Sequence, residues 1–241
     1  MSSGSEKKPS FLKRAVRKID NKISRRLIHT ADAYIDRRIC GQSLVEYVPS
    51  IFRDDENGVG GTGSHASPYC VLECIFSHVT LTASDTLMDV GCGKGRILAF
   101  LVKEHCPCQI YGVEHNPEVA RLAAQWSERY EQVHIIQGDA FQLDYNPFTV
   151  LTLARPFLPK TFLSFVEQLE ATLTHPVTLI YYEDQESSYL LRKRSGWRML
   201  FREKVARIRG VKIAPWPQGY SIWVYDPARR ESDSASPETA K

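Results

Sequence analysis

The chain has 241 residues, 43% of them hydrophobic, and a formal net charge of +3. This length suits one α/β domain with extensions, and no apolar run approaches the roughly 20 residues that a membrane span needs. The first apolar residues stand among lysines and arginines instead of forming a secretory signal, so we expect a soluble, cytoplasmic protein.

The positive charge belongs to the N-terminus. Residues 1–39 contain 11 Lys and Arg against 4 Asp and Glu, a net charge of +7, so the rest of the chain carries −4. A basic segment of this kind predicts an anionic partner, which is an acidic protein, a membrane surface or nucleic acid. The alternative is a helix that packs on its own domain while its charges stay solvated.

The six cysteines lack the spacing of a zinc site, since there is no paired CxxC set and no matching interval of histidines. We therefore predict no metal and expect reduced, mostly buried thiols. They are Cys40, Cys70, Cys74, Cys92, Cys106 and Cys108.

The N-terminal part of the chain predicts a disordered start, a helix and a loop. Residues 1–10 are polar, and residues 11–51 form a basic amphipathic helical extension in which apolar residues recur every three or four positions. Residues 52–67 contain four glycines and predict a mobile loop, after which Ser67 as N-cap and Pro68 at the first helical position predict the start of a helix. In the helical extension, the apolar residues that recur at this spacing are Leu12, Val16, Ile19, Ile23, Leu27, Ala31 and Ile35.

Strands and helices alternate from residue 86 onwards. The strands are predicted at 86–90, 109–114, 133–139, 148–154 and 177–183. The helices are predicted at 95–105, 117–131, 159–173 and 186–194. Such alternation predicts an α/β fold with a doubly wound, mostly parallel sheet, in which ligands bind at the carboxyl ends of the strands.

The end of the domain has a different pattern. Residues 202–226 predict two strands with no helix between them, which should form a terminal antiparallel hairpin. We therefore assign residues 52–226 to one domain. Residues 227–241 are polar and are expected to be a disordered tail.

The first of the alternating strands runs into DVGCGKGR, residues 89–96, which contains Gly91, Gly93 and Gly95. The phosphate-binding pattern GxxxxGK[ST] fails because Gly95 stands where Ser or Thr is needed, and the dinucleotide pattern GxGxxG fails at Arg96. An ordinary turn needs about one glycine, so three predict a ligand that presses on the backbone.

DVGCGKG resembles motif I of the class I S-adenosylmethionine-dependent methyltransferases, and it is similar to small bacterial members in which the motif continues as GCGKGR. Two acidic residues match at the next strand ends, Glu114 in YGVEHN and Asp139 in QGDAF. The resemblance covers about residues 67–226. It implies a seven-stranded Rossmann-like sheet, S-adenosylmethionine as cofactor, and methyl transfer to an unidentified acceptor.

The resemblance also implies a role for each site residue. Asp89 organises the loop and meets the cofactor ammonium, and Glu114 accepts from both ribose hydroxyls. Asp139 accepts from the adenine amino group, while the N–H of Ala140 or Phe141 meets a ring nitrogen. A solvated carboxylate is the alternative for Glu114. The implied cofactor-binding set is Asp89, Gly91, Cys92, Gly93, Gly95, Glu114, His115, Asp139, Ala140 and Phe141.

The substrate side departs from the family pattern. Members that methylate exocyclic amines or glutamine amides carry an Asn-Pro-Pro-Tyr-like motif at the end of the fourth strand, where this chain has ARPF, residues 154–157. Arg155 is expected beside the methyl group, paired with an anionic acceptor or with a protein carboxylate, or else facing water. The substrate-side candidates are Arg155, Phe157, His65 and Tyr69, and no catalytic base is identified.

Two classes of function follow. The intact acidic and glycine motifs favour an active methyltransferase. The altered fourth-strand motif favours the alternative, a catalytically inactive scaffold or regulatory binding protein with the same fold. A nicotinamide-dependent oxidoreductase ranks third.

Overall fold

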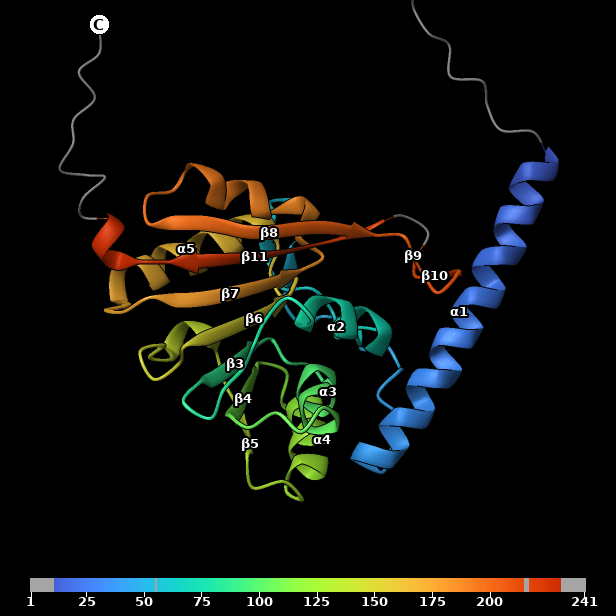
Figure 1. The fold of residues 1–241 in the computed structure, drawn as a ribbon, viewed down its shortest axis with the longest axis horizontal. Helices are drawn as coiled ribbons and strands as arrows, with labels where there is room; N and C mark the ends of the chain where they lie inside the picture. Colours follow the sequence, from blue (N-terminus) through green and yellow to red (C-terminus); the bar gives the residue numbers. More distant parts are fainter. Residues whose placement is uncertain (1–10, 55, 215–216, 231–241) are drawn as a thin grey trace, which may run out of the picture.

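The computed structural model describes residues 11–54, 56–214 and 217–230. Its centre is a seven-stranded sheet in the order β5-β4-β3-β6-β7-β11-β8 (Figure 1). The strands are β3 (Thr86–Val90), β4 (Gln109–Glu114), β5 (Val133–Gln137), β6 (Val150–Ala154), β7 (Val177–Tyr182), β8 (Trp197–Val205) and β11 (Gln218–Tyr225).

The first five of these strands are parallel, and β11 lies antiparallel between β7 and β8. The predicted doubly wound sheet and its terminal antiparallel hairpin are therefore confirmed. Because β3, β4, β5 and β6 are parallel, their carboxyl ends lie at one edge of the sheet. The strand order reverses at β3, and such folds bind ligands at that point of the edge.

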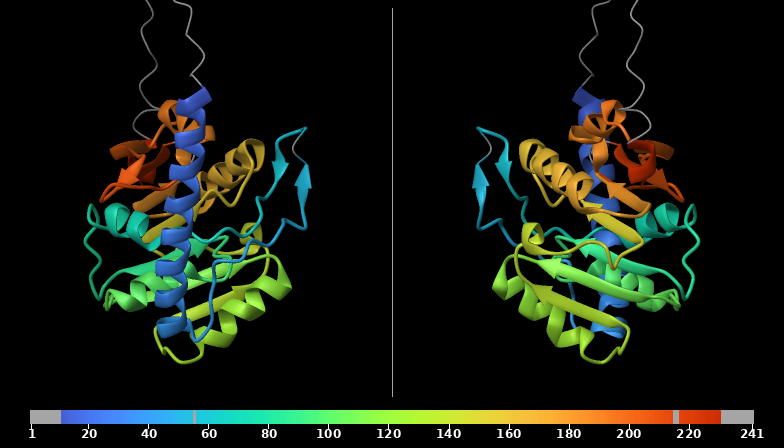
Figure 2. Two further views of the ribbon diagram at one scale, coloured as in Figure 1. Left: turned by 90° about the vertical axis from the view of Figure 1, so that its right-hand side faces the viewer. Right: turned by 90° about the vertical axis from the view of Figure 1, so that its left-hand side faces the viewer.

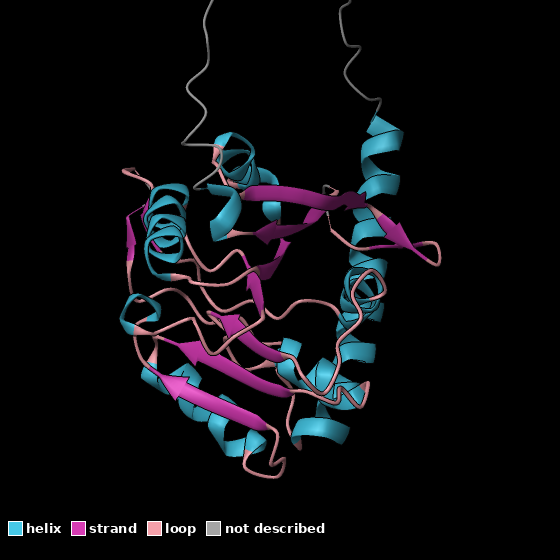
Figure 3. Ribbon diagram, turned by 60° about the vertical axis from the view of Figure 1, so that its left-hand side comes forward, coloured by secondary structure: helices cyan, strands magenta, loops and turns pink. Residues whose placement is uncertain are grey.

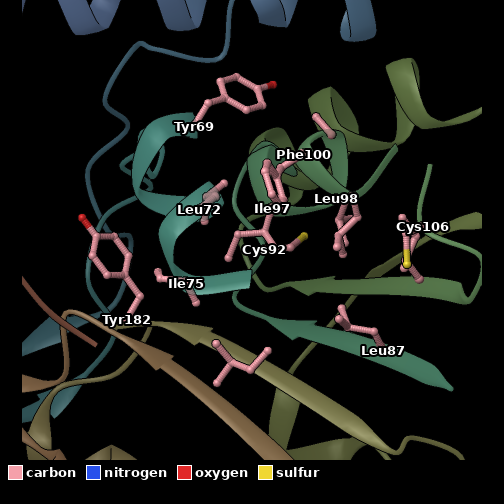
Figure 4. Packing of buried hydrophobic residues seen from close by; sticks show 14 of the residues in the cluster. Tyr69, Leu72, Ile75, Leu87, Cys92, Ile97, Leu98, Phe100, Cys106 and Tyr182 are labelled. Atoms are coloured by element: carbon pink, nitrogen blue, oxygen red, sulfur yellow. The ribbon is translucent and has the colours of Figure 1, made fainter. Parts of the chain in front are cut away.

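Helices cover both faces of the sheet (Figure 3). One face carries α2 (Tyr69–Phe76), α3 (Arg96–Lys103) and α4 (Pro117–Ser127), and the other carries α5 (Pro159–Thr172). Figure 4 shows the first layer, where Leu72 and Phe100 belong to the same buried cluster as Leu87 of β3. Strands buried on both faces explain why the chain shows continuous apolar runs here instead of an alternation.

The basic N-terminal segment forms one long helix, α1 (Phe11–Cys40), which lies along one side of the domain (Figure 2). The predicted apolar row does not face the domain as a whole, because Ile23 and Leu27 are exposed. The buried side is partly polar, since two aspartates on it are bonded to an arginine of the domain. Its buried residues are Ser24, Ile28, Asp32, Asp36 and Cys40.

The glycine-rich segment before α2 contains a small hairpin in place of the predicted loop. Its strands β1 (Arg53–Asp54) and β2 (Val59–Gly60) project from the body of the domain (Figure 2). An isolated bridge from Val48 to Ser64 closes the stretch between α1 and α2 on itself, and one from Gly61 to Phe157 ties it to the domain. The segment therefore passes across the edge where the parallel strands end.

Three smaller differences concern helix ends and turns. Helix α2 begins at Tyr69 with Pro68 as its N-cap, and no side chain caps it, so Ser67 does not have the predicted capping role. Residues predicted as a helix at 186–194 form 3₁₀ turns instead, η2 (Asp184–Glu186) and η3 (Ser188–Lys193). An extra hairpin, β9 (Arg207–Ile208) and β10 (Val211–Lys212), separates β8 from β11.

The two predicted disordered segments lie mostly outside the described residues. This holds for residues 1–10 and for residues 231–241 of the predicted tail, whereas residues 227–230 are helical. Among the described helices, none combines the length and the apolar composition of a membrane span.

Candidate functional site

A cavity of about 310 Å³ lies at the carboxyl ends of β3, β4, β5 and β6. Residues from four strand ends meet there, although they are far apart in the sequence. The cavity is lined by all but one of the predicted cofactor residues: Asp89, Gly91, Cys92, Gly93, Glu114, His115, Asp139, Ala140 and Phe141. The exception is Gly95, which stands at the N-cap of α3.

The glycines of the motif have left-handed backbones, with φ of 71° at Gly91, 57° at Gly93 and 85° at Gly95. Protein atoms also crowd them. A Cβ on Gly91 would lie 2.4 Å from Cβ of Pro156, and one on Gly95 would lie 2.8 Å from the Trp126 ring. The sequence predicted that contact with a ligand requires these three glycines. In the structure, their backbone conformation and the neighbouring protein groups already require glycine.

Asp89 is fully buried at the end of β3. Its Oδ1 accepts a hydrogen bond of 2.7 Å from the Thr152 hydroxyl on the neighbouring strand β6. Burial raises the pKa of Asp89 to about 7, the Thr152 hydrogen bond opposes that rise, and the charge of Glu114 adds to it. A cation placed in the cavity would favour the charged form of this carboxyl group.

Glu114 holds the glycine loop from the end of β4. Its Oε2 accepts from the Gly93 N–H at 2.9 Å, and its Oε1 accepts from the Asn116 N–H at 2.8 Å. Each carboxylate oxygen can accept more than one hydrogen bond. The carboxylate therefore stays fixed by the backbone and keeps acceptor capacity on the cavity side.

Asp139 stands at the end of β5 and caps a short 3₁₀ turn, η1 (Ala140–Gln142). Its Oδ1 accepts from the Phe141 N–H at 3.0 Å, so that N–H already has a partner. The Phe141 ring lies 5.8 Å from the ring of Phe157. Of the two backbone donors predicted to meet a ligand ring, Ala140 is thus the better placed.

The substrate-side candidates separate into two pairs. Phe157 and His65 line the cavity, with His65 exposed at its rim. Although part of the residue is exposed, partial burial of the His65 side chain lowers its pKa, and the nearby His29 and Arg25 side chains lower it further. Neutral imidazole is therefore the favoured form of His65 near neutral pH.

Tyr69 and Arg155 lie outside the cavity lining. Tyr69 is buried, and its hydroxyl donates to Oδ1 of Asp36 at 3.0 Å. Arg155 pairs through Nε with Oε2 of Glu183 at 3.3 Å. It also lines a separate cavity between the β1–β2 hairpin and the start of α5. Arg155 therefore has a protein carboxylate as a partner, one of the alternatives predicted for it.

Sequence reasoning missed the two charged residues inside the motif. Lys94 donates through Nζ to the Glu46 carbonyl at 2.6 Å. Arg96 is buried and donates to Asp32 at 2.8 Å and to Asp36 at 2.6 Å. Both cations therefore bind the N-terminal extension. Two aspartates four positions apart in an otherwise basic helix were the signal in the sequence.

The segment between α1 and α2 forms one wall of the cavity. The ring of Phe52 lies 4.7 Å from that of His115, edge to face. The Thr62 hydroxyl donates to the Arg155 carbonyl at 2.6 Å, and the Thr62 N–H donates to the Pro156 carbonyl at 2.9 Å.

We find no group of three His, Cys, Asp or Glu side chains in the described residues that could hold a metal ion.

Residues 87–173 match a family model described as a methyltransferase domain. A curated relative from Saccharolobus islandicus (strain REY15A), named protein-lysine N-methyltransferase, is 29% identical over 90 residues, which are 36% of this chain and 56% of the relative. The chain thus spans about half the length of that relative.

Two solved structures share the fold. The RNA methyltransferase from Salinibacter ruber in complex with S-adenosyl-L-homocysteine is 20% identical, with a TM-score of 0.50 over 66% of this chain and 93% of that chain. A protein described as StiE O-MT is 14% identical, with a TM-score of 0.52 over 67% of this chain and 75% of that chain.

Proposed function

We propose that this protein binds S-adenosylmethionine in the cavity and transfers the methyl group to an acceptor, since residues 87–173 match the model of a methyltransferase domain and the fold is shared with a methyltransferase solved with S-adenosyl-L-homocysteine. The single observation that carries the proposal is the meeting of Asp89, Glu114 and Asp139 around one cavity. The three carboxyl groups come from consecutive strand ends. They match the three polar portions of the cofactor, which are its ammonium, its ribose diol and its adenine.

The residues present fit the cofactor. Asp89 would lie near the ammonium, and Glu114 would accept from the ribose hydroxyls while its backbone partners keep it in place. Asp139 would accept from the adenine amino group, and the Ala140 N–H would donate to the ring. When bound, the cofactor would supply an electrophilic methyl group: the acceptor provides the electron pair of the new bond, and the electron pair of the broken carbon–sulfur bond stays on the sulfur, which becomes a neutral thioether.

The remaining task of the protein is to orient the acceptor. Well-oriented reactants gain on the order of 7–11 kcal/mol relative to the same groups in solution. Pro156 and Phe157 form the cavity wall at the end of β6, so they are the groups that would position the acceptor beside the methyl. His65 at the rim is the candidate base if the acceptor has to lose a proton.

The chemical class of the acceptor has to be identified by experiment. The name of the archaeal relative makes lysine side chains in proteins one class to include. The Arg155–Glu183 ion pair supports a structural role for Arg155, and this weakens the argument for an anionic acceptor.

All six cysteines are free thiols, which supports the cytoplasm as the proposed location.

The experiment has a binding step and a transfer step. Thermal unfolding is measured with S-adenosylmethionine, S-adenosylhomocysteine and NADPH; a ligand at 100 times its dissociation constant adds about 2.7 kcal/mol of stability. Tritiated methyl transfer into a fractionated host lysate then identifies the acceptor, with Glu114→Ala as the matched control. Stabilisation by the first two ligands together with transfer supports the proposal.

The same experiment tests the alternative, a binding protein of this fold without transfer activity. That alternative is supported by Arg155 in place of the family's asparagine and by its ion pair with Glu183. Cofactor binding without transfer into any fraction would favour it. Stabilisation by NADPH alone would instead contradict both proposals.

A further inference from the structure

The side of α1 that faces away from the domain carries large apolar residues. Ile23, Leu27 and Tyr34 are 56%, 55% and 61% exposed. Steps of four and seven residues place them on one face of a helix. This row lies opposite the buried side of the helix, so the packing of α1 on the domain leaves it uncovered.

Cations flank this row on both sides. They are Lys22, Arg25, Arg26, Arg37 and Arg38, and all five are exposed. The three aspartates of α1 do not neutralise them, because each is engaged by an arginine outside the helix: Asp20 by Arg207, and Asp32 and Asp36 by Arg96. The outward face of α1 is therefore both apolar and strongly basic.

We propose that this face, defined by Ile23, Leu27 and Tyr34 with the five flanking cations, docks the protein on an anionic phospholipid surface. A helix with an apolar row between Lys and Arg side chains lies in the plane of the lipid headgroups and inserts its apolar side chains. Clusters of four to eight basic residues on such a helix select anionic lipids. The surface is independent of the cofactor cavity and does not rest on the proposed function.

Two other occupants fit less well. A second copy of the same face would bring five cations against five, and like charges in contact are unfavourable. Nucleic acid would engage the cations through its phosphates but would leave the apolar row without contact. An anionic membrane satisfies both features of the face.

The anchoring of α1 makes docking possible without unfolding. Asp32 and Asp36 fasten the inner side of the helix to Arg96, and Arg207 of the β9–β10 hairpin holds Asp20. The 30 residues of α1 span about 45 Å at about 1.5 Å per residue. Figure 2 shows this length running along one side of the domain, so the outward face can lie flat on a surface.

The test is sedimentation of the full chain with vesicles of phosphatidylcholine alone and of phosphatidylcholine with an equal part of phosphatidylserine. We expect binding to the anionic vesicles only, and weaker binding as salt is raised. Arg25→Gln with Arg26→Gln should lower the partition coefficient about 30-fold, or roughly fivefold per cation. Ile23→Ser with Leu27→Ser should lower it about tenfold.

Matched controls change exposed residues of the same kinds elsewhere. Arg192→Gln with Lys193→Gln replaces two exposed cations, and Tyr189→Ser replaces an apolar residue that is 58% exposed. These variants should bind like the wild type, and every variant should keep the wild-type unfolding temperature. Absence of wild-type binding, equal binding to neutral vesicles, or equal losses in the controls would overturn the proposal. Binding of a DNA duplex, but not of vesicles, would also overturn it.

Discussion

Nη2 of Arg96 lies 2.6 Å from Oδ2 of Asp36, and both side chains are buried. Arg96 ends the glycine-rich motif and Asp36 stands near the end of α1, so the cofactor loop and the N-terminal helix share one ionic cluster. Asp32 completes the cluster, and burial raises its pKa to about 6 although Arg96 opposes the rise. The Tyr69 hydroxyl and the Leu44 N–H also donate to Asp36.

The cluster predicts that Asp36→Ala strongly destabilises the protein. Removing one partner of a buried ion pair leaves the other charge without compensation, which costs about 3–5 kcal/mol. Urea denaturation measures the loss. Asp20→Ala is the matched control on the same helix, because its partner Arg207 is about half exposed, and that change should cost less than about 1 kcal/mol. Equal small losses in both variants would contradict the prediction.

Deletion of residues 1–39 gives a second test of the same cluster. From the sequence alone, this deletion is predicted to spare cofactor binding. The structure leads to the opposite prediction, because the deletion removes both aspartates that pair with Arg96 and uncovers the apolar cluster against which Ile35 and Ile39 of α1 pack. We expect the truncated protein to unfold well below the temperature of the full chain. An unchanged unfolding temperature with full cofactor affinity would restore the sequence-based prediction.

Glu114→Ala is predicted to weaken the binding of S-adenosylhomocysteine while the fold survives. A hydrogen bond to a charged group contributes about 1.5–3 kcal/mol, so affinity should fall about ten- to a hundredfold. Calorimetry measures the change, with circular dichroism as the control for folding. Glu114→Gln should lose less, since its amide keeps one acceptor oxygen. Unchanged affinity in a folded alanine variant would refute the proposed position of the cofactor.

The raised pKa of Asp89 predicts a pH-dependent affinity. Its pKa is about 7 in the fold and about 4 in an unfolded chain, so the free protein loses stability as pH rises through that window. A bound ammonium group favours the ionised carboxylate. Affinity for S-adenosylhomocysteine should therefore rise up to about tenfold per pH unit below pH 7 and level off above it.

Calorimetry between weakly acidic and weakly basic pH measures this rise and the proton released on binding. Asp89→Asn is the control, because an amide has no proton to lose in this range. It should bind more weakly at high pH and show a flat profile. The same rise in both proteins would assign the titration to another group, of which His65 is the first candidate.

The ion pair between Arg155 and Glu183 predicts a structural role for both residues. Each has a left-handed backbone, with φ of 50° and 55°, and they directly follow β6 and β7. The pair is partly exposed, so a double-mutant cycle with alanine should give a coupling energy of about 0.2–1 kcal/mol. Cofactor affinity and methyl transfer should stay within a few-fold of the wild type. A large loss of kcat/KM in both Arg155→Ala and Arg155→Lys, with cofactor affinity kept, would instead place Arg155 at the acceptor.

The parallel sheet could be predicted because its strands are short apolar runs, and four of the five end at or directly before a glycine or an acidic residue; β6, which is followed by Arg155, is the exception. Glu114 and Asp139 follow such runs, and the carboxyl ends of parallel strands meet at one edge. The position of these side chains thus followed from local patterns. The hydrogen bonds of these side chains could not be predicted from local patterns, because the donors are backbone N–H groups of the glycine loop and of the η1 turn.

The N-terminal helix shows why the remainder could not be predicted. Periodicity predicted a helix with an apolar row that includes Ile23 and Leu27, yet Asp32 and Asp36 determine which side of the helix faces the domain. A buried ion pair joins residues about 60 positions apart, and no local pattern records such a contact. The β1–β2 hairpin was missed for a similar reason. Its two-residue strands are too short to show an alternation, and bridges to residues such as Phe157 hold the segment.

The contact between Trp126 and the glycine loop gives the protein an optical reporter of its own cofactor site. The indole Nε1 donates to the Lys94 carbonyl at 2.9 Å, and the ring lies against Gly95. Tryptophan emission depends on the hydrogen bonding and polarity around the indole. Any rearrangement of the loop that changes the Lys94 carbonyl will therefore appear in the intrinsic fluorescence of an unlabelled protein, and Trp126→Phe identifies which part of the signal comes from this residue.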